Sequence, residues 1–175
     1  MRPWLLTLGC ALCLAAQGGP LPTLHHLVLH EQAGTWTVVA RLFVQPGQPP
    51  VVSKGTETNK VVSGGLWLQS ELRADMGGQA FEGHGLSGFD THQGAHVGSW
   101  VDGSDTWMAS MKGTCARNCR EQTLFFESFG PNRKVVTHKQ VHVQVDHDHR
   151  SLTLYVQAPK GGFVKEMEME YVRVK

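Results

Sequence analysis

The stretch FEGHGLSGFDTHQGAHVGSWVD, residues 81–102, decides the fold class of this chain. It contains two apolar segments typical of β-strands, and the residues DTHQG between them are typical of a turn. Glycine occurs at Gly83, Gly85 and Gly88 within the first segment. We interpret these glycines as places of tight strand curvature in a closing barrel. The stretch therefore predicts a hairpin within a curved sheet.

Similar segments continue on both sides of this hairpin. About ten strands follow one another at roughly ten-residue spacing, separated by short turns. Only residues 24–33 (LHHLVLHEQA) have helical spacing, and Gly34 ends that segment. A meander of this length removes its edges by closing on itself. We therefore expect an all-β fold and, rather than a sandwich, an antiparallel up-and-down barrel of about ten strands with a short N-terminal helix.

Residues 1–18 have the features of a secretory signal peptide. Arg2 provides the basic start, an uncharged and mostly apolar run follows, and small residues precede the expected cleavage after Gly18. The run is shorter than the ~20 apolar residues that span a bilayer, which disfavours the alternative of an uncleaved anchor. We expect residues 19–175 to form one domain, secreted or periplasmic, without a stable membrane anchor.

The charge balance disfavours a nucleic-acid partner. The chain carries 16 Lys and Arg against 15 Asp and Glu, and loss of Arg2 with the signal peptide leaves the mature domain near neutral. Nucleic-acid binders normally carry a basic excess, because neutralising phosphates drives their binding. A polybasic segment for a membrane surface is also absent from the sequence.

Two cysteines follow the signal peptide, Cys115 and Cys119 in GTCARNCREQ. In an oxidising compartment we expect them to form a disulfide. The alternative is half of a metal site, which needs further ligands nearby. His147 and His149 flank Asp148, but the run DHDH is typical of a hairpin turn. The sequence therefore predicts a structural disulfide, with no metal site and no cofactor.

Aromatic and methionine side chains dominate the predicted inner faces. Barrels of this size either fill with side chains or hold one small ligand. An apolar pocket with a few polar groups suits a small apolar or amphipathic molecule, and methionine makes such a pocket adaptable. The candidate pocket residues are Phe81, Phe89, Trp100, Trp107, Met111, Phe126, Met167, Met169 and Tyr171.

The strand register decides which polar side chains point into the barrel. On the predicted register the inward polar residues are Thr56, Thr58, Thr137 and Lys139. His138 and His142 then point outward. A slip by one residue reverses every such assignment.

Signatures of known catalytic sites are absent from the sequence. The run Gly85-Leu86-Ser87-Gly88 is one residue too short for a Gly-x-Ser-x-Gly elbow. For an enzyme acting at the barrel mouth, the candidate acid–base groups are His84, Asp90 and Asp102. Three hypotheses follow: a ligand-binding barrel, which we favour, an enzyme at the mouth, and a structural or interaction protein with a solid core.

The two ends of the chain resemble the signature of the calycin superfamily. Gly34-x-Trp36 follows a short helix, and Arg173 lies on the last predicted strand. In calycins a Trp of the first strand packs under an Arg of the last strand and closes one end of the barrel. The resemblance therefore implies structural roles for Trp36 and Arg173, joined by a cation–π contact.

The chain also resembles the bacterial domain of unknown function family 1579. The runs PGQPPVVSKGTE, SGGLWLQSEL, GLSGFD with GAHVGSWVD, and MEMEYVRVK follow the family's order and spacing over residues 24–175. Members of that family are small, often exported, and resemble calycin-type barrels. The loop from Cys115 to Cys119 departs from the family pattern, where a plain Asp-Gly type hairpin is usual. The resemblance implies the fold and transfers no catalytic residue.

Overall fold

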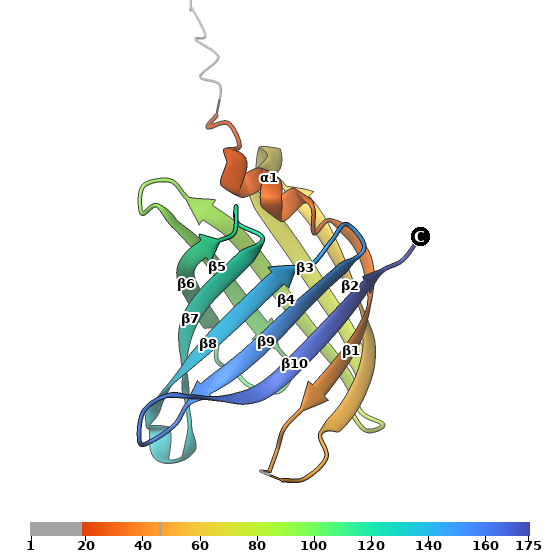
Figure 1. Cartoon of the computed structure of the whole chain (residues 1–175), viewed down its shortest axis with the longest axis vertical. Helices are drawn as coiled ribbons and strands as arrows, with labels where there is room; N and C mark the ends of the chain where they lie inside the picture. Colours follow the sequence, from red (N-terminus) through yellow and green to blue (C-terminus); the bar gives the residue numbers. More distant parts are fainter. Residues whose placement is uncertain (1–18, 46) are drawn as a thin grey trace, which may run out of the picture.

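The strands close into an antiparallel barrel in which each strand pairs with its neighbours in sequence and the last strand pairs with the first. This computed structural model describes residues 19–45 and 47–175, and the predicted signal peptide lies outside them. Figure 1 shows helix α1 lying over one end of the barrel. The predicted fold class, a ten-stranded antiparallel barrel with a short N-terminal helix, is confirmed.

The elements follow the predicted order. They are α1 (Leu24–His30), β1 (Gly34–Leu42), β2 (Val51–Val62), β3 (Trp67–Asp75), β4 (Ala80–Asp90), β5 (Ala95–Asp102), β6 (Ala109–Ala116), β7 (Glu121–Phe129), β8 (Val135–Gln144), β9 (His149–Gln157) and β10 (Phe163–Arg173), with short 3₁₀ turns at Ser63–Gly65 and Pro131–Arg133. Among the helices of the described residues, none has the length and apolar character needed to cross a membrane.

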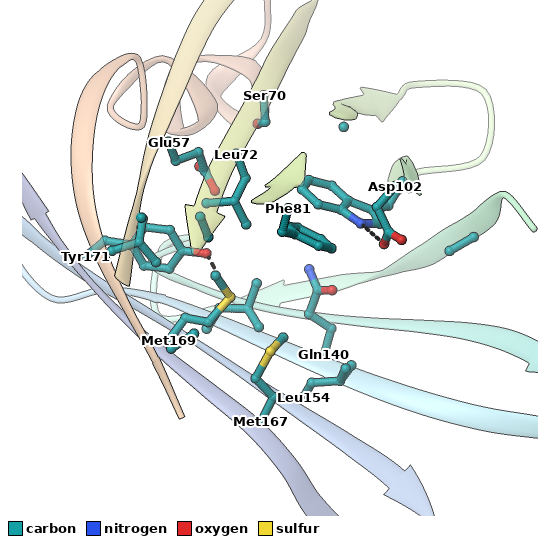
Figure 2. A pocket seen from close by; sticks show the side chains of 18 of the residues that line it. Glu57, Ser70, Leu72, Phe81, Asp102, Gln140, Leu154, Met167, Met169 and Tyr171 are labelled. Atoms are coloured by element: carbon teal, nitrogen blue, oxygen red, sulfur yellow. Dashed lines mark hydrogen bonds between the residues drawn. The ribbon is translucent and has the colours of Figure 1, made fainter. Parts of the chain in front are cut away.

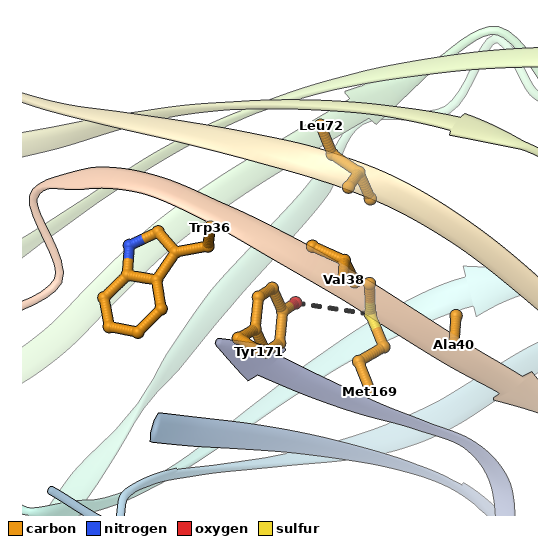
Figure 3. Packing of buried hydrophobic residues seen from close by; sticks show 6 residues of the cluster. All are labelled: Trp36, Val38, Ala40, Leu72, Met169 and Tyr171. Atoms are coloured by element: carbon orange, nitrogen blue, oxygen red, sulfur yellow. Dashed lines mark hydrogen bonds between the residues drawn. The ribbon is translucent and has the colours of Figure 1, made fainter. Parts of the chain in front are cut away.

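The hydrophobic core lies where the first and last strands meet. Trp36 of β1 pairs with Arg173 of β10, and the register continues to Leu42 opposite Met167. Alternate residues of both strands therefore point inward. The buried cluster consists of Trp36, Val38, Ala40, Leu72, Met169 and Tyr171 (Figure 3). This cluster fixes the seam that closes the barrel.

The segment Glu31–Ala33, which connects α1 to β1, is fastened to the barrel through its backbone carbonyl groups. The indole N–H of Trp36 donates to the carbonyl oxygen of Gln32 at 2.9 Å. The guanidinium of Arg173 donates to the carbonyls of Ala33 and Glu31, both at 2.6 Å, and lies 4.1 Å from the centre of the Trp36 ring. The end of the barrel beneath α1 is therefore closed by the Trp–Arg contact that the calycin resemblance implies.

Two glycines of β4 make room for an indole ring. Trp100 of β5 lies across Gly83 and Gly85, and an added Cβ at Gly83 would be 2.2 Å from Cζ2 of that ring. At Gly85 the corresponding distance to Cε3 is 3.0 Å. These two glycines are thus explained by the close approach of a neighbouring side chain, a cause that differs from the strand curvature we predicted from the sequence.

Replacing Gly83 by alanine is expected to destabilise the protein by about 1–3 kcal/mol, because the new methyl group forces Trp100 from its position. The measurement is urea unfolding followed by circular dichroism. Gly103→Ala is the matched control, since an added Cβ there meets nothing within 4 Å. Equal stability of the two variants would contradict this account of Gly83.

Candidate functional site

The barrel encloses a cavity of about 410 Å³. Residues near its mouth are Met76, which follows β3, and Asp105 and Trp107, which lie between β5 and β6. Strands β3 and β5 both end at the side of the barrel opposite α1 (Figure 1). The walls of the cavity are mainly apolar, with leucine, methionine and aromatic side chains from many strands (Figure 2). The interior is therefore hollow, which disfavours the hypothesis of a solid core.

Eight of the nine candidate pocket residues line this cavity. They are Phe81, Trp100, Trp107, Met111, Phe126, Met167, Met169 and Tyr171. Trp107 stands at the mouth, where its indole N–H donates to the carbonyl of Glu127 at 3.0 Å and its ring packs edge-on against Phe129. Met167, Met169 and Tyr171 are alternate residues of β10, and this alternation in the sequence predicted that all three point inward.

Phe89, the ninth candidate, lies elsewhere. Its ring stacks on His25 of α1 with centroids 3.9 Å apart and an interplanar angle of 5°. The ring also packs edge-on against His96 at 5.1 Å. Phe89 belongs to the closed end beneath the helix, because β4 runs past the cavity to that end.

A buried ion pair forms the deep end of the cavity. Glu57 of β2 lies opposite Trp36 in the β1–β2 register, and its carboxylate accepts hydrogen bonds from Arg150 of β9 and from Asn59. The guanidinium of Arg150 stacks 3.8 Å from the ring centre of Tyr171 and 4.7 Å from that of Trp36. Both charged side chains are almost completely buried, so each depends on the other.

Tyr171 and His142 stay neutral beside this ion pair. Burial, together with the charge of Glu57, raises the pKa of Tyr171, and its hydroxyl donates to Sδ of Met169 at 3.3 Å (Figure 3). Burial and the positive charge of Arg150 lower the pKa of His142 from 6.5 to about 3. The imidazole of His142 faces the cavity, where its apolar surroundings and the nearby Arg150 disfavour the charged form.

The polar side chains that face the cavity differ from those predicted. On β2 the buried polar residues that line the cavity are Ser53 and Glu57, with Thr56 and Thr58 on the opposite parity. On β8 the lining residues are Gln140 and His142, with Thr137 and Lys139 on the opposite parity. The sequence register was therefore wrong by one residue on both strands. Lys139 instead lies over the rings of Tyr155 and Phe163.

Glu57 and Arg150 were not identified from the sequence as cavity residues, and the reason is the same for both. A charged side chain such as Glu57 is expected at the surface, because burying it is costly without a partner. Its partner Arg150 lies 93 residues away, so the local pattern does not show the pair. One signal was available: in the β1–β2 hairpin, Glu57 falls opposite Trp36, whose inward orientation the calycin resemblance implies.

The three candidate acid–base groups do not meet around one cleft. His84 points to the outer face of β4, where it contacts Glu82 at 2.9 Å. Asp90 ends β4 beside α1, whereas Asp102 lies at the mouth. Partial burial opposes ionisation of Asp102, yet hydrogen bonds from Ser104 and Trp100 lower its pKa. Their separation removes the geometric basis for an enzyme built on these groups.

Comparisons with known proteins support the fold. The model of the family described as "Protein of unknown function (DUF1579)" matches residues 21–173. The crystal structure of Rv2717c from M. tuberculosis superposes with a TM-score of 0.63 at 13% identity, covering 89% of this chain and 100% of that one. A protein of unknown function from the DUF3598 family of Nostoc punctiforme superposes with a TM-score of 0.45 at 12% identity, covering 89% and 50%. No curated protein matches the chain.

Proposed function

The chain belongs to the DUF1579 family of unknown function, and we propose from its cavity that it is an exported barrel that binds one small amphipathic molecule. The observation that carries this proposal is the hollow, mainly apolar interior of about 410 Å³ with a polar deep end. Ligand pockets have this size and this composition, with few polar groups that orient the ligand.

The charges along the cavity favour a neutral or cationic head group. Arg150, the cation at the deep end, is already paired with Glu57. The mouth carries Asp102 and Asp105. Lys54 adjoins the cavity, but it is exposed and alternates to the outer face of β2. The excess negative charge would therefore repel a carboxylate ligand, whereas it would attract a protonated amine and would not repel an uncharged alcohol.

Displacement of an environment-sensitive fluorescent probe tests this selectivity. A long-chain alcohol and the matching amine are expected to displace the probe at least about tenfold better than the carboxylate of equal length, a difference of ~1.4 kcal/mol. Native mass spectrometry of the same samples should show one bound molecule. A separate measurement tests export: the mass of the protein recovered from the periplasm or medium should show that residues 1–18 have been removed.

Two variants of β3 provide the control. Ser70 lines the cavity, so Ser70→Phe should reduce binding strongly by occupying the interior. Gln69, the adjacent exposed residue, points to the outer face, so Gln69→Phe should bind like the parent protein. Equal binding by both variants, or no displacement by any amphipath, would refute the proposal.

A further inference from the structure

A second cluster of functional side chains lies at the opposite end from the mouth, beneath α1. It consists of His25 of α1, His96 of β5, Cys115 of β6 and Cys119 of the turn between β6 and β7. One nitrogen or sulfur atom from each of these residues lies within 4.8 Å of all the others. Four segments of the chain, at both sides of the helix–barrel junction, therefore present ligand atoms to one point.

The structure contains the predicted disulfide between Cys115 and Cys119. We propose that its reduction converts this cluster into a Cys₂His₂ site for one Zn²⁺ ion. Thiolate sulfur and imidazole nitrogen are the ligands that Zn²⁺ prefers. Four such ligands form the closed tetrahedral set typical of structural zinc. The proposal is independent of the barrel cavity and of any ligand bound there.

The separations of the ligand atoms fit a tetrahedral site. With Zn–N of about 2.0–2.1 Å and Zn–S of about 2.3 Å, neighbouring ligand atoms lie roughly 3.3–3.8 Å apart. His25 Nδ1 lies 3.3 Å from His96 Nε2. The same Nδ1 atom lies 3.2 Å from Sγ of Cys119 and 3.7 Å from Sγ of Cys115. Reduction frees the two sulfurs to separate from each other, and the histidines already have the required spacing.

Packing alone does not explain His96. The side chain is only 2% exposed, and its Nδ1 atom has no hydrogen-bond partner among the residues that the structure describes. Its polar contact is through Nε2, with His25. A buried polar group without a partner is costly, so an apolar side chain would serve better if this position were only structural. Metal ligation through Nε2 would give the imidazole a role, while Nδ1 would keep its proton and would stay without a partner among the described residues.

The turn that holds Cys119 is also unusual. Arg117, Asn118 and Cys119 all have positive φ, at 53°, 55° and 61°. Each non-glycine residue in this left-handed region costs of order 1 kcal/mol, and such residues cluster at functional sites. This conformation brings the Cys119 sulfur to within 3.2 Å of the His25 ring nitrogen.

The chemistry balances with a phosphine as the reductant. The phosphine and one water molecule reduce the disulfide to two thiols, and the phosphine becomes its oxide. Zn²⁺ then binds the two thiolates with release of two protons. The ion would join His25 on the helix to three ligands on the barrel, so it would fasten α1 over the closed end. In the oxidised protein the sulfurs are bonded to each other and the site is lost.

Cobalt substitution tests the site directly. The untagged protein is reduced anaerobically with the phosphine and titrated with Co²⁺ and then with Zn²⁺. We expect one Co²⁺ per chain, with the intense visible bands of a tetrahedral ion and a thiolate-to-metal charge-transfer band, and full displacement by Zn²⁺. Amide hydrogen exchange in α1 should become slower with Zn²⁺. The oxidised protein should bind neither ion.

Variants then assign the ligands. Cys115→Ser, Cys119→Ser, His25→Ala and His96→Ala should each lower Zn²⁺ affinity by at least about 10- to 100-fold, the loss found even for residues that only support a metal ligand. His92→Ala is the matched control, because His92 is exposed in the nearby β4–β5 turn and should leave the affinity unchanged. Absence of the charge-transfer band in the reduced parent protein, or equal binding by the oxidised form, would overturn the proposal without reference to any variant.

Discussion

Replacing Arg150 by methionine is expected to destabilise the protein by about 3–5 kcal/mol, the cost of leaving one member of a buried ion pair without its partner. Glu57 would keep its burial and the hydrogen bond from Asn59 but lose its cation. The rings of Trp36 and Tyr171 would each lose their cation–π contact with the guanidinium. Urea unfolding of the variant and the parent protein, compared at neutral pH, measures this difference.

A second variant separates the lost charge pair from the lost packing. In Glu57→Gln/Arg150→Met no charge is left unpaired, so the double variant should be more stable than Arg150→Met alone. Arg41→Met is the surface comparison, because Arg41 and its partners Glu168 and Glu170 are partly exposed. That change should cost less than about 1 kcal/mol. A loss for Arg150→Met no larger than that for Arg41→Met would show that the buried pair is not important for stability.

The fold could be predicted because its pattern is local. The alternation through Trp36, Val38 and Ala40 indicates a strand with one buried face, and each short turn indicates a hairpin. Closure follows from the length of the meander. The same alternation on β10 placed Met167, Met169 and Tyr171 on the inner face, where they line the cavity.

The polar part of the site could not be predicted, because it depends on contacts between distant residues. Glu57 and Arg150 are 93 residues apart, and charged side chains are ordinarily found at the surface, so the local pattern does not identify this buried pair. His25 is separated from Cys115 by 90 residues and from His96 by 71, so their meeting follows only from the final register and the position of α1. The alternation within one strand determines neither the register nor the position of α1, since a slip by one residue exchanges the two faces of the strand.

The histidine that lines the cavity, His142, should make the protein sensitive to acid. In the folded state the pKa of His142 is lowered from 6.5 to about 3 by burial and by Arg150. Between these values the unfolded chain binds a proton that the folded chain does not bind. The stability therefore falls as the pH falls from 6.5 towards 3, and the contribution of neutral His142 is fully present only above 6.5.

Replacing His142 by glutamine removes the pH-dependent loss of stability that this imidazole causes, and it keeps a polar side chain in the cavity. Each unit below the ordinary pKa costs ~1.4 kcal/mol, so at about pH 4.5 the parent protein should have lost roughly 2–3 kcal/mol more than the variant, relative to neutral pH. Urea unfolding at about pH 7.5 and pH 4.5 gives the four free energies of unfolding, and other groups that titrate in both proteins cancel in the difference. His92→Gln, at an exposed position, should follow the parent protein at both pH values. If His142→Gln loses as much stability as the parent protein on acidification, the imidazole is already protonated within the folded barrel, and the cavity must then be polar enough to solvate a second cation beside Arg150.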